Sequence, residues 1–209
     1  MASIISASTT SSTALNLSGD TTGILQLATG ATPTTAVTID ASQKVTFAQP
    51  IQGGSITSGT AVASTSGTAV LFTGIPSWAK RITVMFNGVS LSGTSNILIQ
   101  IGSGSVTTTS YQSSAGIFGA STSGVTSTTG FIVYDGATAS QSWYGITTLC
   151  LLSSNTWIGS SSGGLNIAFG SAGGGVSPNL AGALDRINIT TVNGTDTFDA
   201  GSINIMYEG

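Results

Sequence analysis

Two stretches of this chain alternate apolar and polar residues with a period of two, the spacing of a β-strand whose two faces meet different surroundings. They are "KRITVMFNGVSLSGTSNILIQIG" at residues 80–102 and "DRINITTVNGTDTFDAGSINIMYEG" at residues 185–209. Each holds two alternating runs joined by a polar segment, so each predicts a hairpin-like pair of strands, and Asn87-Gly88 is a strong signal for a tight turn. The residues expected to share buried faces are Ile82, Val84 and Phe86; Ile97, Ile99 and Ile101; Ile187 and Ile189; and Ile203, Ile205 and Tyr207.

Charged residues make up only 5% of the 209 residues, against roughly 25% in ordinary globular proteins. Ser, Thr and Gly supply close to half of the chain, whereas Glu, Lys, Arg and Gln, which favour helices, are scarce. The hydrophobic fraction of 40% is too high for a disordered segment. We therefore expect an all-β folded protein with an uncharged, hydroxyl-rich surface, which resists association with other copies less than a charged surface does.

The same composition disfavours several classes of partner. Four basic residues and a net charge of −3 argue against nucleic acid, which requires a basic surface. No window approaches the roughly 20 apolar residues of a membrane-spanning helix, so we expect no membrane insertion. The first residues carry neither a basic segment nor a long apolar run, and we expect no secretory signal.

Residues 1–60 differ from the rest of the chain and predict a shaft-like or anchoring segment. They contain short alternating runs, each followed by Gly, Asp or Pro: "ALNLSG", "GILQLATG", "TAVTID", "KVTFAQPI" and "GSIT". Such runs are typical of a hairpin stack or a solenoid-like coil. Phe47 is the first aromatic residue, and Phe72 is the next. Because this segment has too little bulk to form a core alone, we expect it to pack against copies of itself, most simply around a threefold axis.

Residues 61–209 predict an all-β domain of roughly eight strands, either a β-sandwich or a jelly roll. Long Gly- and Ser-rich stretches, "FGASTSGVTSTTG" at 118–130 and "FGSAGGGVSPNLAG" at 169–182, read as loops between these strands. Loops of that length are usually functional or mobile. If a ligand binds, we expect it there.

The sequence offers little catalytic chemistry. It has no histidine, which excludes Ser–His–Asp and Cys–His catalysis and His-ligated metals. Asp196 and Asp199 are the only two carboxylates close in sequence, and in an expected hairpin loop they are better explained as turn residues than as a catalytic or calcium-binding pair. We therefore expect no catalytic residue, no cofactor and no metal, and we interpret Asp185-Arg186 as a surface or inter-subunit ion pair.

The single cysteine, Cys150, rules out an intrachain disulfide. Its run "TTLCLLS" predicts a buried strand and an inert thiol. Trp143, Tyr144 and Trp157 could stack on sugar rings, and they are the candidate residues for contact with a glycan or a protein partner. In a β-sandwich, however, aromatic residues more often belong to the core or to an interface.

The stretches "GTAVLFTGIPSWAKRITVMFNGVSLSGTSNILIQIGSG" and "DRINITTVNGTDTFDAGSINIMYEG" resemble the distal domain of tailed-bacteriophage fibre and appendage proteins, and the N-terminal "STALNLSGDTTGILQLATGATPTTAVTIDASQKVTFAQPI" is similar to the shaft-like repeats ahead of such domains. The resemblance implies a virion structural protein, a homotrimer assembled in the cytoplasm of an infected bacterium. Its expected partners are copies of itself and other virion proteins of the tail, the baseplate or the capsid. It implies no catalytic residues.

Three readings follow from these observations. A trimeric tail fibre or tail-associated appendage is the first, with a head fibre or another capsid decoration protein as its alternative location. A module that recognises a glycan on the host surface is the second, and it is compatible with the first. An enzyme such as a depolymerase is disfavoured by the short chain, the lack of histidine and the scattered carboxylates.

Overall fold

A computed structural model describes residues 24–29, 32, 34–49, 56–119, 122–139, 141–166 and 169–209. These residues form strands and turns, in agreement with the expected all-β class, and they contain no helix. The expected strand at "ALNLSG" lies outside the described residues. The chain divides into two compact units, Met1–Ile51 and Gln52–Gly209.

The first unit contains a three-stranded antiparallel meander formed by β1 (Leu25–Thr29), β2 (Thr34–Ile39) and β3 (Val45–Phe47). All three strands coincide with expected short runs. The turn between β2 and β3 is fixed by Asp40, whose side-chain Oδ1 accepts hydrogen bonds from the backbone N–H groups of Ser42 and Lys44 at 2.9 and 3.0 Å. Gln43 in this turn has a φ of 65°, so the local Asx geometry returns the chain sharply to β3.

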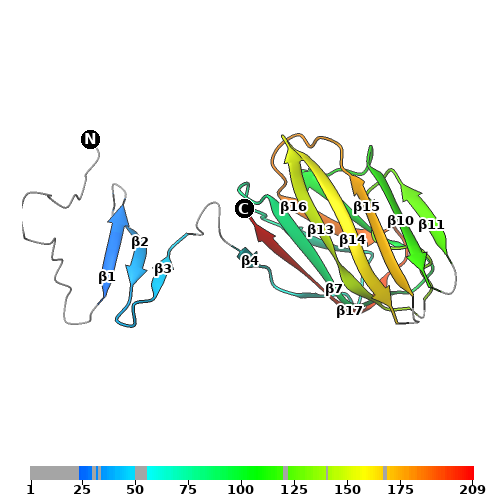
Figure 1. Cartoon of the computed structure of the whole chain (residues 1–209), viewed down its shortest axis with the longest axis horizontal. Helices are drawn as coiled ribbons and strands as arrows, with labels where there is room; N and C mark the ends of the chain where they lie inside the picture. The colour runs from blue at the N-terminus through cyan, green and yellow to red at the C-terminus, as the bar shows by residue number, and fades with distance from the viewer. Residues whose placement is uncertain are drawn as a thin grey trace, which may run out of the picture. The chain divides into compact units, whose positions relative to one another are not determined.

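The second unit consists of two antiparallel sheets (Figure 1). The larger contains nine of the described strands: β4 (Ile56–Ser58), β5 (Val62–Ala63), β7 (Arg81–Leu91), β10 (Gln112–Phe118), β11 (Ser123–Ser127), β13 (Trp143–Ser153), β14 (Thr156–Leu165), β15 (Gly170–Val176) and β17 (Phe198–Glu208). Their order is β11-β10-β15-β14-β13-β7-β17-β4, and β5 also pairs with β17. The smaller contains β6 (Ala69–Thr73), β8 (Ile97–Ser103), β9 (Ser105–Val106), β12 (Phe131–Ile132) and β16 (Arg186–Thr191), in the order β12-β8-β16-β6 with β9 beside β8.

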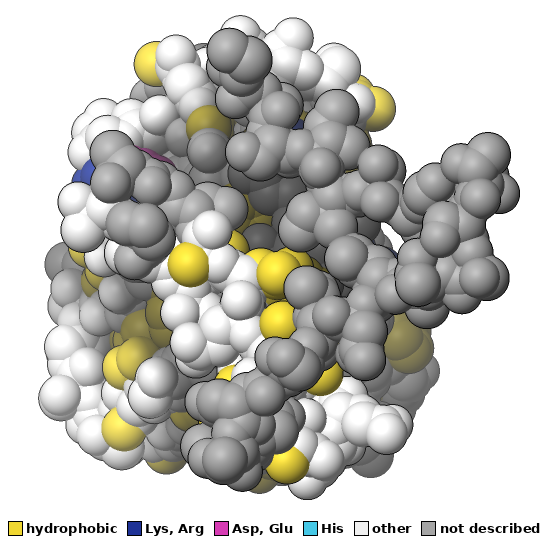
Figure 2. Space-filling model, turned by 90° about the vertical axis from the view of Figure 1, so that its left-hand side faces the viewer, with side chains coloured by type: hydrophobic (Ala, Val, Ile, Leu, Met, Phe, Trp, Pro, Cys, Tyr) yellow, Lys and Arg dark blue, Asp and Glu magenta, His cyan; other side chains and the backbone are white. Residues whose placement is uncertain are grey.

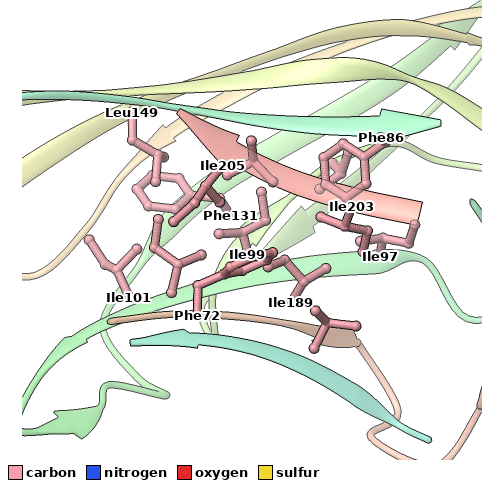
Figure 3. Close-up of a cluster of buried hydrophobic side chains, with 14 of the residues drawn as sticks. Phe72, Phe86, Ile97, Ile99, Ile101, Phe131, Leu149, Ile189, Ile203 and Ile205 are labelled. Atoms are coloured by element: carbon pink, nitrogen blue, oxygen red, sulfur yellow. The ribbon is translucent and has the colours of Figure 1, made fainter. Parts of the chain in front are cut away.

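The two sheets enclose one main hydrophobic core. In Figure 3 the side chains of Phe86, Leu149, Ile203 and Ile205 from the larger sheet point toward those of the smaller sheet. The smaller sheet contributes Phe72, Ile97, Ile99, Ile101, Phe131 and Ile189. The period-two alternation therefore predicted the buried faces correctly, and Tyr207 packs against the same core. Each fully buried Ile, Leu or Phe contributes about 1.5–3 kcal/mol, so burial in this layer stabilises the second unit.

The expected hairpins at residues 80–102 and 185–209 are not hairpins. β7 and β17 lie in the larger sheet, whereas β8 and β16, their sequence neighbours, lie in the smaller one. Each pair is thus an arch that carries the chain from one sheet to the other. Alternation fixes which residues are buried, but it is the same for two strands that pair and for two strands that face each other across a core. Only the ladder partners distinguish these arrangements.

Asn87-Gly88 makes no turn, because β7 runs through it. Gly88 has a φ of 63°, and the register of β7 shifts at this point against both β13 and β17. On β17, Gly201 has a φ of 92°, and a Cβ there would lie 2.5 Å from the carbonyl oxygen of Gly88. The positive-φ glycine that suits a tight turn also suits a β-bulge inside a strand, which explains the error in the turn prediction.

Both stretches expected to be loops contain strands. β11 lies within residues 118–130 and β15 within residues 169–182, and the two flank β10 in the larger sheet. Glycine is normally disfavoured in strands. Here it provides space: a Cβ at Gly173 would lie 2.8 Å from the Ala115 Cβ, and one at Gly170 would lie 2.2 Å from the Phe118 ring. The contact selects glycine at Gly173, where a Cβ would also lie 2.9 Å from the Ser114 carbonyl oxygen, whereas the exposed Phe118 side chain could move to admit a side chain at Gly170.

The chain divides after Ile51, several positions before residue 60, near which the boundary was expected. β4 (Ile56–Ser58) pairs with β17, with Thr57 opposite Tyr207, so these residues belong to the second unit. None of the residues covered by the structure forms a helix long and apolar enough to cross a membrane.

Candidate functional site

The most unusual surface of the described chain is one face of the N-terminal sheet. The register aligns two rows of apolar side chains across β1, β2 and β3: Leu25, Ile39 and Val45 in one row, and Leu27, Val37 and Phe47 in the other. Because every second residue of each strand points to the same side, all six side chains share one face. We call these six residues the apolar face.

The opposite side of the same sheet is polar. Gln26 lies opposite Thr38, and Thr38 lies opposite Thr46, so these side chains form a row on the other face. The sheet is therefore amphipathic, in the way that a sheet covering a core on one side is. Among the described residues of the first unit, no further strand covers the apolar side: Leu27 is 45% exposed and Phe47 is 46% exposed.

A three-stranded sheet of such short strands is not expected to be stable with its apolar side in water. Full burial of a Leu, Val or Phe side chain contributes about 1.5–3 kcal/mol, and the apolar face has six such positions. Among the described residues, four of the six side chains, Leu25, Leu27, Val45 and Phe47, are exposed, and Val37 and Ile39 are half-buried. The side of the molecule that Figure 2 shows is also poor in charge. Among its coloured side chains, hydrophobic and uncharged ones predominate, and charged ones are visible at only a few points.

The three aromatic residues that were candidates for glycan contact differ in their burial. Trp143 is fully buried and Trp157 is 2% exposed, and both belong to the main core, so neither indole meets a ligand at the surface. Trp143 stacks on Tyr134 with ring centroids 5.1 Å apart. Only Tyr144, the neighbour of Trp143 on the opposite face of β13, is exposed, at 49%. The two tryptophans therefore follow the favoured interpretation of core aromatics, and of the three candidate residues Tyr144 alone has a side chain exposed for surface contact.

Asp196 and Asp199 engage different partners. Asp196 lies in the arch between β16 and β17, where Oδ2 accepts a hydrogen bond from the Ser95 backbone N–H at 2.9 Å and Oδ1 accepts one from Asn193 Nδ2 at 2.9 Å. These donors lower the pKa of the Asp196 carboxyl, with the Asn193 side chain as the largest cause. Asp199 lies inside β17, not in a loop, and accepts a hydrogen bond from the Ser90 hydroxyl of β7. Both carboxylates therefore hold segments of the fold together.

Asp185 and Arg186 form the expected surface ion pair, within one chain. The Arg186 Nε lies 2.7 Å from the Asp185 Oδ1, and both side chains are partly exposed. The Gly104 backbone N–H also donates to both carboxylate oxygens at 3.1 Å. The hydrogen bond from Arg186, followed by the one from Gly104, lowers the pKa of Asp185. The pair thereby fixes the turn between β8 and β9 to the start of β16.

Cys150 is exposed, contrary to the expectation of a buried thiol. On β13, Leu149 is fully buried in the core, and the next side chain necessarily points to the outer face of the sheet. The run "TTLCLLS" is continuously apolar at Leu149–Leu152, but the strand has only one buried face there. The residues that the structure covers contain no cluster of three or more Cys, Asp or Glu side chains able to hold a metal ion.

The apolar face was only partly visible in the sequence. The period-two runs predict β1, β2 and β3. Their scarcity of aromatic residues predicts packing against other copies, but it does not identify the residues that would form the contact. Nothing in the runs gives the register that aligns Leu25 with Ile39 and Leu27 with Val37. A search for three successive short runs with apolar residues at alternate positions, joined by short turns, would have identified the face. Comparisons of the chain with protein-family models, with curated proteins and with solved structures find no match.

Proposed function

We propose that this protein is a structural component of a tailed-bacteriophage virion: a homotrimeric, fibre-like appendage associated with the tail and assembled in the host cytoplasm. The single observation that carries the proposal is the apolar face, on which Leu25, Leu27, Val45 and Phe47 are exposed and Val37 and Ile39 are half-buried. A surface of this kind is completed by a partner, and identical copies are the simplest partner that every chain can find.

In the proposed assembly, three copies complete this face. Three amphipathic sheets can surround a common axis with their apolar faces inward and the Gln26–Thr38–Thr46 faces outward. This arrangement of three sheets buries all six apolar side chains of each chain. It leaves the uncharged hydroxyl and amide groups of the outward faces in contact with water. The scarcity of charge supports this arrangement, because the net charge of −3 per chain adds little repulsion between copies.

The second unit forms the distal domain of this appendage, and we include in the proposal that its two sheets form a jelly-roll variant. The arches β7–β8 and β16–β17 support this assignment, since they send consecutive strands to opposite sheets. The protein acts by assembly and contact and not by catalysis. The carboxylates Asp185, Asp196 and Asp199 support that role, since their hydrogen bonds join segments of the domain.

The test is to locate the chain in purified particles. Mass spectrometry of virions from a phage encoding the chain should detect it at a multiple of three copies per particle, and an electron cryomicroscopy map should show threefold density on the tail. Threefold density on the capsid exterior would assign the alternative role of a head fibre or decoration protein. Absence of the chain from purified virions would contradict the proposed function.

A further inference from the structure

The outer face of the smaller sheet carries a groove with a volume of about 300 Å³. Its floor is formed by the outward side chains of two adjacent strands, Leu98 and Gln100 from β8 and Asn188 and Thr190 from β16. One wall is formed by Thr108 and Thr129 from the segments beside β9 and β12. The lining also includes Thr191, the last residue of β16, and residues 192–194 at the beginning of the arch to β17. No residue that lines this groove is charged.

Two amides on the floor are held in fixed orientations. Gln100 is only 8% exposed, and its Nε2 donates to the Thr129 carbonyl oxygen at 3.0 Å. Its Oε1 must then be the acceptor, and it receives a hydrogen bond from Asn188 Nδ2 at 3.1 Å. This relay leaves one N–H of each amide and the Asn188 Oδ1 without a partner among the described residues, so the floor presents donors and an acceptor that are already ordered.

The strands below the groove cannot accept a peptide by main-chain pairing. β8 is paired with β12 and β16, and β16 is paired with β8 and β6, so the backbone groups of the floor strands are engaged on both sides. A ligand must therefore be recognised by side chains, which here are amides, threonine hydroxyls and the exposed apolar group of Val192, since Leu98 is only 2% exposed. Hydroxyl groups that both donate and accept, carried on an apolar C–H framework, match this surface.

We infer that this groove binds a short, neutral saccharide through Gln100, Asn188 and the threonine hydroxyls. Its volume is at the small end of ligand sites, about 300–1,000 Å³, so it accommodates a short segment of a glycan. The absence of charge from the lining gives no preference for acidic sugars. This site is distinct from Trp143, Tyr144 and Trp157, and the inference goes beyond the proposed function because it does not require assembly into a virion.

The test uses the full chain, an array of neutral and acidic oligosaccharides, and saturation-transfer NMR with galactose, glucose and N-acetylglucosamine as separate probes. We expect at least one neutral probe to bind. Asn188→Leu should weaken that binding about tenfold, the effect of losing one or two hydrogen bonds. Thr148→Val, a similar change on the outer face of the larger sheet, should leave the affinity unchanged.

Because Asn188 lies in a central strand, Thr108→Val in the exposed wall provides a second variant, and circular dichroism checks that each variant is folded. The inference is overturned if no neutral probe binds, if only acidic sugars bind, or if binding persists unchanged in folded Asn188→Leu and Thr108→Val proteins. It is also overturned if Gln100 and Asn188 resonances shift with protein concentration alone, since a second copy would then occupy the groove. The oligomeric mass of the same samples is measured separately, so a trimer without sugar binding rejects only the groove.

Discussion

The Asp196 carboxylate occupies the space that a side chain at Gly93 would need. A Cβ at residue 93 would lie 2.3 Å from the Asp196 Oδ2, and the same oxygen accepts the backbone N–H of Ser95 at 2.9 Å. Gly93 belongs to the arch between β7 and β8, and Asp196 belongs to the arch between β16 and β17. Further bonds join the arches: Ser92 N–H donates to the Thr197 carbonyl at 2.9 Å, and Thr197 N–H donates to the Ser92 Oγ at 3.0 Å.

Substitution of Gly93 should therefore loosen the contact between the two arches. Gly93→Ala forces the Asp196 carboxylate away from its donors, and we expect a loss of about 1–3 kcal/mol in the free energy of unfolding, the usual cost of overpacking. Gly104→Ala is a poor control because Gly104 has a positive φ of 72°. Gly124→Ala is better, since its nearest neighbour would be 3.7 Å away. Urea unfolding followed by tryptophan fluorescence measures both; equal stability of the two variants would contradict the proposed contact.

The stability of the fold should decrease in acid. The pKa values of Asp185 and Asp196 are lowered in the folded state, so both carboxylates stabilise the fold above the unfolded pKa of about 3.9. That stabilisation is lost as the pH falls through the lower, folded-state pKa values. Thermal unfolding midpoints measured from pH 7 to pH 2 should fall below about pH 4, and the double variant Asp185→Asn/Asp196→Asn should have a flatter profile. An unchanged profile in the double variant would show that these carboxylates do not couple to folding.

Stability should also decrease at high pH because of two buried phenols. Burial raises the pKa of Tyr111 to about 12, and it raises the pKa of Tyr134 as well. Between the unfolded pKa of about 10 and the folded value, the unfolded chain loses a proton that the folded chain keeps, so the folded state becomes less stable as the pH rises. Phenolate absorbance should show these two groups ionising together with unfolding, as followed by circular dichroism. Their ionisation in a protein that remains folded at pH 10 would contradict this expectation.

The Trp143 indole requires glycine at two neighbouring positions. A Cβ at Gly145 or at Gly163 would lie 2.7 Å from the Trp143 Cζ2, and one at Gly163 would also lie 2.3 Å from the Tyr144 carbonyl oxygen. Gly163→Ala should destabilise the fold by about 3 kcal/mol. Gly164→Ala, on the opposite face, meets nothing closer than 3.5 Å and should change stability by less than about 0.5 kcal/mol. Chemical denaturation measures the free energy of unfolding of both variants. A Gly163→Ala effect as small as that of Gly164→Ala would contradict the close contact between the Trp143 indole and residue 163.

The strands with bulky residues at alternate positions could be predicted from the sequence, because alternation is a local property of one strand. Ile82, Val84 and Phe86 are buried as expected. The pairing of strands is not local. β7 pairs with β13 and β17, which follow it by more than 50 and 100 residues respectively, and no signal in "FNGVSLSGTSN" distinguishes an arch from a hairpin.

Glycine-rich strands such as β15 were missed for a related reason. Their stability comes from what packs on them, since Ala115 and Phe118 occupy the space left open at Gly173 and Gly170. The propensity of glycine taken alone predicts a loop there. The apolar face was missed because it depends on register across three strands, and the Gln100–Asn188 groove was missed because its residues lie 88 positions apart in the chain.

The mass of the full chain in solution tests the central claim most directly. Sedimentation analysis at micromolar concentration should give three times the 20.6 kDa of one chain. Phe47→Ser, which removes one large side chain from the apolar face, should shift the equilibrium toward smaller species, since each copy loses about 1.5–3 kcal/mol of burial. Thr46→Ser, on the opposite face of the same strand, should leave the mass unchanged. A wild-type chain that sediments as a folded particle of 20.6 kDa would contradict the account.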